Sequence, residues 1–147
     1  MSTRSNIAIQ RRNKQVEVIY CHCDGDLSHN GKMLLEHYTD LDKINSLIEL
    51  GNISFLHKYI EPIETDKEHS FYNPQKEVVV AYGRDRNEEE QQKRVYKDIG
   101  DYLDNIGWDI EYAYIYKEEE NQWYYINFHI NDSVRLLTKQ VIEDSEY

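Results

Sequence analysis

Hydrophobic and polar residues alternate along the first part of the chain, and this period of two predicts a β-hairpin over residues 2–21. Ile7 and Ile9 are separated by polar or small residues, and the same alternation returns over residues 16–20 after a polar reversal. Alternation of this kind is typical of half-buried strands, in which successive side chains point to opposite faces. The hairpin leads into the loop Cys21–Gly31, where two cysteines and two histidines lie close together in sequence.

After this loop, apolar residues recur at spacings of three and four as far as Gly51, which predicts an amphipathic helical region. Ser28 is the expected cap of its first helix. Thr39 is followed by Asp42 at the spacing of a second cap, so we expect two helices broken near Thr39. Similar spacing predicts three further helical segments: a short turn over residues 53–59, a helix over residues 96–106, and a closing helix with Val134, Leu137 and Val141 on one face.

Two strand patterns differ from the first hairpin. Three consecutive valines in Glu77–Tyr82 predict a central strand buried on both faces, because β-branched residues without polar alternation leave no solvent side. Asp109–Lys117 and Trp123–Phe128 are alternating and rich in aromatic residues. The polar segment 118–121 separates them, so they predict a second hairpin with an acidic tip.

Strand pairs separated by helices, with a hairpin at each end, indicate the α+β class. We therefore expect a single α+β domain spanning residues 1–147. Its antiparallel or mixed sheet should have about five strands, with helices packed on one face. A doubly wound parallel fold requires a regular alternation of strands and helices, which the sequence lacks.

Charge narrows the possible partners. The chain has 147 residues and a formal net charge of -11, and residues 98–147 carry twelve acidic residues against three lysines or arginines. A field of this sign repels nucleic-acid phosphate and anionic lipid, so neither direct nucleic-acid binding nor a membrane partner is expected. The sequence contains neither an apolar run near eighteen residues nor a signal-peptide core, so we expect a soluble intracellular protein.

The thirteen tyrosines suggest how such a protein makes contacts, because tyrosine combines an apolar ring with a polar tip. Acidic residues at the tip of the C-terminal hairpin would attract a protein with a basic surface, and exposed tyrosines of the same hairpin would supply short-range contacts. Alternation turns about half of these tyrosines toward the core. The residues assigned to this surface are Glu118, Glu119, Glu120, Tyr112, Tyr114 and Tyr116, with Tyr124 and Tyr125 as further candidates.

The cysteines and histidines of the Cys21–Gly31 loop are of metal-ligand type, but their spacing does not favour a metal site. Structural zinc takes paired spacings such as Cys-x₂₋₄-Cys, whereas Cys21 and Cys23 are separated by one residue and no second pair exists. We therefore expect no metal and no cofactor, and we interpret Cys21 as a small buried residue. A cysteine nucleophile with a distant histidine base stays open, because the sequence selects no histidine.

An anion pocket is the alternative to a partner surface. Arg84 and Arg86 flank Asp85 directly after the predicted central strand, and the arginine fork suits phosphate or carboxylate. If this loop, Gly83–Arg86, and the loop Cys21–Gly31 lie at one end of the sheet, they would enclose a site for a small ligand or nucleotide. Its side chains would be His22, Asp24, His29, Arg84 and Arg86. The competing interpretation is that Asp85 pairs with a neighbouring arginine and that Asp24 orders its own turn.

Five segments of this sequence carry a resemblance to a known family. They are Ser2–Ile9, Ile19–His22 with Asp24-Gly25, Ser28–Tyr38, Leu47–Ser54 and Ala81–Arg86. On these segments the protein resembles a family of short bacteriophage and prophage proteins, and the resemblance extends over most of the chain. It departs from the family pattern at Cys23, where the family has tryptophan, and at Asp26-Leu27, where it has Tyr-Pro.

The resemblance implies a phage accessory protein that is expressed in the cytoplasm of a bacterial host and acts on host or phage macromolecules. Small acidic phage proteins are often inhibitors of host defence, of the anti-CRISPR or anti-restriction type. By this analogy we expect a non-enzymatic protein that binds and inhibits a nucleic-acid-handling defence complex of the host. The family provides no catalytic residues that could be assigned to positions of this chain.

Overall fold

The N-terminal hairpin lies at the centre of the sheet. The structure is a computed structural model that describes residues 2–107 and 109–145. Strands β1 (Ser5–Gln10) and β2 (Val16–Cys21) pair antiparallel, with Ser5 opposite Cys21, which confirms the predicted hairpin. β1 is buried along nearly its whole length, because β6 pairs with its other edge.

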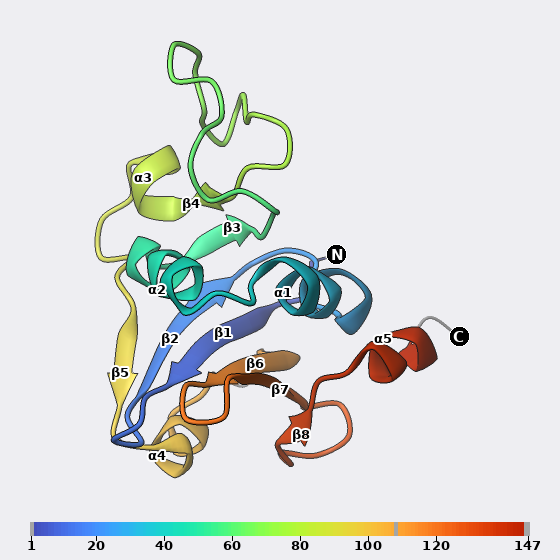
Figure 1. Cartoon of the computed structure of the whole chain (residues 1–147). Coiled ribbons are helices and arrows are strands. Elements are labelled where there is room, and N and C mark those ends of the chain that lie inside the picture. Colours follow the sequence, from blue (N-terminus) through green and yellow to red (C-terminus); the bar gives the residue numbers. More distant parts are fainter. Residues whose placement is uncertain (1, 108, 146–147) are drawn as a thin grey trace.

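In the described part of the chain, eight strands form one mixed sheet around this hairpin (Figure 1). Their order is β4-β3-β2-β1-β6-β7-β8, and β5 pairs with β2 beside this path. The strands not yet bounded are β3 (Ile53–Phe55), β4 (Val80–Ala81), β5 (Arg94–Tyr96), β6 (Tyr112–Lys117), β7 (Gln122–Asn127) and β8 (Arg135–Leu136). The α+β class is confirmed. The sheet exceeds the expected five strands because three further strands of two or three residues, β3, β5 and β8, are too short to show a period.

The outer edge of β2 is shared between two partners. Residues 16–18 pair antiparallel with β5, whereas Cys21 pairs with Ile53 of the parallel strand β3. Between these two pairings the backbone N–H of Tyr20 donates to the side-chain oxygen of Asn52, at 2.9 Å. An asparagine side chain thus satisfies the backbone of β2 at the point where β3 and β5 diverge.

The helices after the Cys21–Gly31 loop lie where the sequence predicts them, but their caps differ from the predicted ones. The helical elements are η1 (Leu27–Gly31, a π-helical turn), α1 (Lys32–His37), α2 (Leu41–Leu50), α3 (Tyr82–Arg86), α4 (Ile99–Asp104) and α5 (Lys139–Ser145). The predicted break near Thr39 is confirmed, but Asp40 is the cap, since its side chain accepts the N–H of Asp42 at 3.1 Å. Ser28 caps no helix and donates instead to the Asp26 carboxylate.

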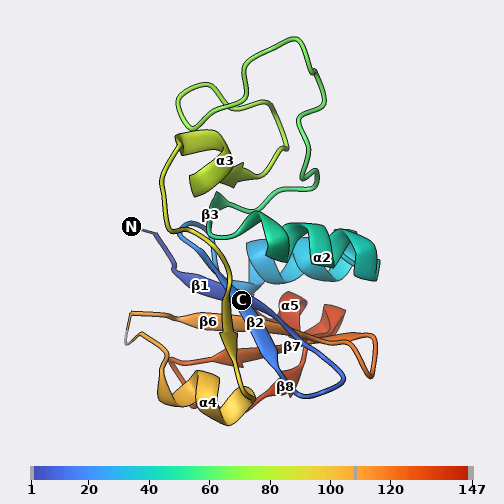
Figure 2. The ribbon, with the colours of Figure 1, turned by 90° about the vertical axis from the view of Figure 1, so that its left-hand side faces the viewer.

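Helices cover both faces of the sheet, not one face as predicted (Figures 1 and 2). On one face α1, α2 and α5 pack over Ile7, Ile19 and Tyr114. On the other face α4 packs over Ala113 and Ile115. β6 is apolar on both sides, so each side requires a cover.

The prediction of a central strand over Glu77–Tyr82 is wrong. The regular part of this segment is β4, which has only two residues and lies at the edge of the sheet. The valines are nevertheless buried because the preceding chain folds back over them, with the N–H of Val79 donating to the carbonyl of Tyr59 at 2.8 Å. The prediction that the three valines are buried is therefore confirmed, whereas the prediction that they form a central strand is wrong.

Three other boundaries differ from the predictions. Residues 53–55 form the strand β3, not a helical turn, because they pair with β2 and β4. The predicted helix 96–106 begins only at Ile99, after Asp98, whose side chain accepts the N–H of Asp101 at 2.8 Å. The closing helix begins at Lys139, because the chain before it pairs with β7 as β8.

The C-terminal hairpin is confirmed. β6 and β7 pair antiparallel, with Tyr114 opposite Tyr125 and Lys117 opposite Gln122. The acidic segment 118–121 forms the turn between them, and Asn121 takes the left-handed conformation with a φ of 55°. Asparagine tolerates this region better than most residues.

Candidate functional site

The Cys21–Gly31 loop is held tightly against the sheet. The N–H groups of His22 and Cys23 donate to the carbonyls of Ile53 and Ser54 at 3.1 and 3.0 Å, which continues the pairing of β2 with β3. Further along, the hydroxyl of Tyr114 donates to the carbonyl of Gly25 at 2.6 Å. The loop is therefore a fixed part of the core wall.

Its polar side chains point to separate partners. His22 Nδ1 lies 2.8 Å from the Tyr20 hydroxyl, and His29 Nδ1 lies 2.9 Å from Asn30 Oδ1. Asp24 is exposed and has a φ of 57°, a left-handed conformation that aspartate tolerates better than most residues. The ring of His29 meets that of His57 edge-on, and burial followed by the neighbouring His29 holds the pKa of His57 below its ordinary value.

The two cysteines differ in environment. Cys21 is fully buried, and burial raises the pKa of its thiol to about 12. Its sulfur accepts from Asn30 Nδ2 at 3.3 Å, whereas Cys23 is partly exposed beside the hydroxyl of Ser2. Cys21 has the surroundings of an inert structural cysteine, as the sequence predicted.

This difference predicts selective labelling. We expect iodoacetamide to modify one thiol per native chain at pH 8, because the thiolate is the reactive form and Cys21 is both buried and protonated there. Mass spectrometry should place the label on Cys23, and Cys23→Ser should abolish labelling of the native protein. Both thiols should react in denaturant. Native labelling of Cys21 would contradict this assignment.

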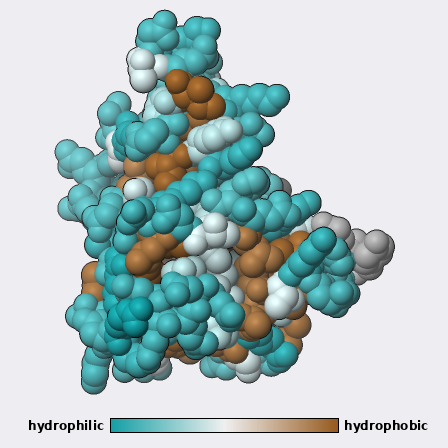
Figure 3. All heavy atoms as spheres, in the orientation of Figure 1, coloured by the Kyte–Doolittle hydropathy of each residue, from teal (hydrophilic) through white to brown (hydrophobic). Residues whose placement is uncertain are grey.

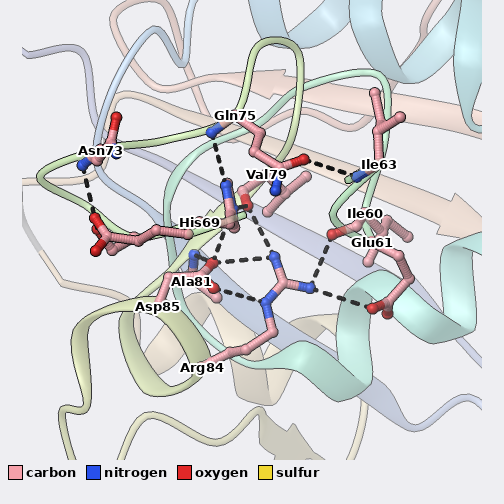
Figure 4. A network of polar contacts seen from close by, with 12 residues as sticks. Ile60, Glu61, Ile63, His69, Asn73, Gln75, Val79, Ala81, Arg84 and Asp85 are labelled. Carbon is pink, nitrogen blue, oxygen red and sulfur yellow. Dashed lines mark hydrogen bonds and ion pairs between the residues drawn. The ribbon is translucent and has the colours of Figure 1, made fainter. Parts of the chain in front are cut away.

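Arg84 is committed to the base of a long loop. We call residues 56–79, between β3 and β4, the projecting loop, because they extend beyond the sheet (Figures 1 and 2). The Arg84 guanidinium donates to both carboxylate oxygens of Asp85 at 2.9 and 3.0 Å. It also donates to the carbonyls of Ile60 and Val79, at 2.8 and 2.9 Å, which belong to the two ends of the loop (Figure 4). The interpretation that Asp85 pairs with a neighbouring arginine is confirmed.

A buried histidine completes this network. His69 Nδ1 accepts the N–H of Gln75 at 2.9 Å, so this nitrogen carries no proton and the ring is neutral. Nε2 then holds the proton and donates to the carbonyl of Val79 at 2.8 Å, with the Asp85 carboxylate 3.4 Å away (Figure 4). A buried histidine beside an aspartate resembles a catalytic pair, but both ring nitrogens here bind the backbone. The arrangement orders the loop and leaves no group free to act on a substrate.

Arg86 is also engaged. Its guanidinium lies 4.2 Å from the ring centre of Phe71 and 4.6 Å from that of Tyr82. It pairs with Glu88 at 2.8 Å and donates to the Ser54 hydroxyl at 3.2 Å. Ser54 also accepts the backbone N–H of Cys23, so Arg86 lies on the side of the Cys21–Gly31 loop. Arg84 lies instead at the base of the projecting loop.

The five residues of the predicted anion pocket have separate partners. Several surface cavities of about 280 to 340 Å³ lie in the described residues, and these are not lined by His22, Asp24, His29, Arg84 or Arg86. Arg84 and Arg86 contact different elements, and each has internal partners. Arg84 and Arg86 are close in sequence but do not share a site, because α3 turns successive side chains to different sides.

The tyrosines of the C-terminal hairpin mostly face the core. Tyr114 and Tyr116 are 0% and 3% exposed, so they cannot contact a partner. Tyr112 is half-buried and stacks on Tyr114, while Tyr124 and Tyr125 are partly exposed on opposite faces of β7. The prediction that all three β6 tyrosines belong to a partner surface is corrected for Tyr114 and Tyr116.

The acidic tip is balanced by basic residues of the neighbouring β1–β2 turn. Glu118 lies 3.9 Å from Arg11, and Glu119 pairs with Lys14 at 3.0 Å. Glu120 lies 3.8 Å from Lys117. These pairings offset part of the charge of the three glutamates locally, although Arg11 is shared with Glu17 at 2.7 Å.

The side chains that sequence reasoning missed lie in the projecting loop. Tyr72 and Ile63 are 92% and 59% exposed, and Phe71 contacts Arg86. The available signal was the length of the segment between Phe55 and Val80, since irregular loops this long are usually functional or disordered.

Comparisons of the chain with protein-family models, with curated proteins and with solved structures gave no match. Within residues 2–107 and 109–145, no group of three or more histidine, cysteine or acidic side chains is placed to hold a metal ion. The helices of the described segments are all too short or too polar to cross a bilayer.

Proposed function

We propose that this protein is a non-enzymatic binding protein whose partner is a host protein with a basic surface, and that the projecting loop makes the central contact. The observation that carries the proposal is the largely buried network of Arg84, Asp85 and His69, which ties the two ends of a long irregular loop together. Ordering such a segment costs about 1–2 kcal/mol per residue in backbone entropy. A loop that served only as a connection would not need this support.

The surface of the loop supports the same proposal. Its exposed aromatic and aliphatic side chains, Tyr72 and Ile63, are of the kinds that form contact centres in protein interfaces. The projecting end of the molecule is otherwise mainly hydrophilic (Figure 3). Apolar side chains surrounded by polar ones match the anatomy of an interface with a polar rim.

Charge supports a basic partner. The segment 57–77 carries five acidic residues against three lysines, and Glu88, Glu89 and Glu90 follow α3 at the same end of the molecule (Figure 1). Glu89 and Glu90 have no ion pair among the residues with described positions, unlike the glutamates of the hairpin tip. With the net charge of -11, this end attracts basic proteins and repels nucleic acid.

The resemblance to phage accessory proteins supplies the class of partner. A nucleic-acid-handling defence complex of the bacterial host presents a basic groove, which an acidic binding protein would occupy in the manner of anti-CRISPR or anti-restriction proteins. The role is then inhibition by occupation, which needs no catalytic group.

A capture experiment with matched variants tests this proposal. The immobilised protein, incubated with nuclease-treated bacterial lysate at low and high salt, is expected to retain a protein partner more strongly at low salt. The paired change Ile63→Ser and Tyr72→Ser should reduce retention at least tenfold, because central aromatic contacts contribute about 2 kcal/mol or more each.

The control is the pair Ile130→Ser and Leu136→Ser, which removes exposed apolar side chains, 71% and 43% exposed, from the other end of the sheet. This variant should retain the partner as the unchanged protein does. Equal retention by all three proteins would rule out the loop as the contact. Turnover of a nucleotide or nucleic acid by the isolated chain would favour an enzyme.

A further inference from the structure

A polar cavity with aromatic walls lies on the α4 face of the sheet, away from the projecting loop. Its volume is about 290 Å³, at the lower end of the range for small-molecule sites. It is lined by residues of β2 and β5, near the point where β3 and β5 diverge, and by Tyr102 of α4 with residues 105–107 and 109–110. Figure 2 shows how β2, β5 and α4 lie relative to one another. Tyr20, Tyr96 and Tyr102 contribute to its lining.

Two buried polar groups in this cavity have unused hydrogen-bonding capacity. Asn6 Nδ2 donates to the Tyr102 hydroxyl at 2.7 Å, and the two residues are 8% and 1% exposed. Because the hydroxyl accepts here, its own proton needs another acceptor, and no residue of the described segments supplies one. Asn6 Oδ1 has no donor in the same residues.

The unused oxygen of Asn6 is accessible from the cavity. No fully buried side-chain nitrogen or oxygen in the described residues lacks a partner, so Asn6 Oδ1, which has none, is open to the space that Asn6 lines. An asparagine with a free oxygen and a second N–H offers one acceptor beside one donor. This is the pattern that matches the amino group and ring nitrogen on one edge of adenine.

An unpaired cation lies at the same cavity. Arg94 of β5 lies opposite Val18, and both residues line the space. Arg94 is exposed and has no ion pair within the described part of the chain, whereas Arg11, Arg84 and Arg86 are all paired. Its guanidinium is therefore available to a phosphate.

We propose that this cavity binds a free adenine mononucleotide, with the base on the partly exposed rings of Tyr20 and Tyr96 and against Asn6 and Tyr102, and with the phosphate on Arg94. Aromatic rings favour a flat ligand, and stacking contributes about 1–3 kcal/mol per base. A single nucleotide suits the volume. A nucleic-acid strand shares the same chemistry, but the net charge of -11 repels a polyanion far more strongly than a mononucleotide.

Titration of the full chain with AMP, adenosine and a short oligo(dA), followed by NMR, tests this site. AMP is expected to shift the signals of residues lining the cavity in a saturable manner and to bind more tightly than adenosine. Arg94→Gln should weaken AMP binding about 3- to 10-fold and leave adenosine binding unchanged, since only the phosphate contact is lost. Tyr102→Phe, which keeps the ring, should weaken both ligands about 3- to 10-fold.

Arg135→Gln is the matched control, because Arg135 is an exposed strand arginine of β8, at the far edge of the sheet. It should leave AMP binding unchanged. The proposal is overturned by the absence of saturable shifts with AMP, by equal AMP affinity in the Arg94→Gln and unchanged proteins, or by binding of oligo(dA) alone. The variants' spectra show directly whether each is folded.

Discussion

Replacing Asp85 by alanine is expected to lower the free energy of unfolding by about 3–5 kcal/mol, the usual cost of removing one partner from a buried ion pair. The Asp85 carboxylate is 3% exposed and accepts from the Arg84 guanidinium and from the N–H of Ala81. Its loss leaves the buried N–H of Ala81 without its acceptor and removes the carboxylate partner of a partly buried guanidinium, which keeps only its bonds to the carbonyls of Ile60 and Val79 and the exposed Glu61. Urea unfolding of the variant and the unchanged protein measures the difference.

The same change should free the projecting loop before the rest of the fold opens. Lys58, Lys67 and Lys76 lie in this loop, so trypsin should cut there faster in the Asp85→Ala protein. Glu61→Ala is the control, because Glu61 contacts the same guanidinium at 3.8 Å but is 81% exposed. It should change stability by about 0–1 kcal/mol. Equal effects of the two substitutions would mean that the network does not anchor the loop.

The Asp85→Ala and Glu61→Ala proteins also show whether an ordered projecting loop is needed for partner binding. If the loop is a preorganised contact surface, its release should weaken partner capture even where Ile63 and Tyr72 are intact, because ordering would then oppose binding. A loop that binds equally well when released would instead be an adaptable segment. The proposed function therefore predicts that capture follows loop order as well as loop composition.

The parts of the fold that sequence predicted well are those with local periodicity. The two hairpins and the break between α1 and α2 each follow from alternation or capping within about twenty residues. β3, β5 and β8 were not predicted as strands, because two or three residues carry no period, and β4 was predicted too long and at the wrong place in the sheet. Their pairing is decided by segments distant in sequence, and tertiary context overrides local preference there.

The candidate site shows the same division. The pair Arg84 and Asp85 was foreseen because the residues are adjacent, whereas His69 joins them only through the folding of the projecting loop. Alternation correctly placed Tyr114 and Tyr116 on one side of β6, but it does not say which side a helix covers. Neither the pairing of Glu119 with Lys14 nor the cavity at Asn6 has a local signal, because each joins segments about a hundred residues apart.

The cavity at Asn6 lies where β2 divides its edge between β3 and β5, and Gly51 lies close to this division. Gly51 ends α2 with a φ of 85° and a ψ of -160°, a region that only glycine adopts readily. It lies against the backbone of Gln91, whose carbonyl accepts the N–H of Asn52 at 2.8 Å. This contact holds the chain entering β5 beside the chain entering β3.

Gly51→Ala is therefore expected to destabilise the protein by roughly 2–5 kcal/mol, from backbone strain and overpacking together. A Cβ at this position would lie 2.2 Å from the Gln91 carbonyl oxygen, and backbone on both sides prevents relief.

Gly100→Ala is the control: its Cβ would meet only Asp98 Oδ1 at 3.4 Å, and alanine favours the α4 helix by roughly 0.5–1 kcal/mol. Urea unfolding should show that the Gly51→Ala protein is less stable than the unchanged protein and that the Gly100→Ala protein is more stable. Hydrogen exchange should show the loss in the Gly51→Ala protein first at residues 16–18, where β2 pairs with β5. Equal stability of the Gly51→Ala and unchanged proteins would show that the strands diverge without this close approach.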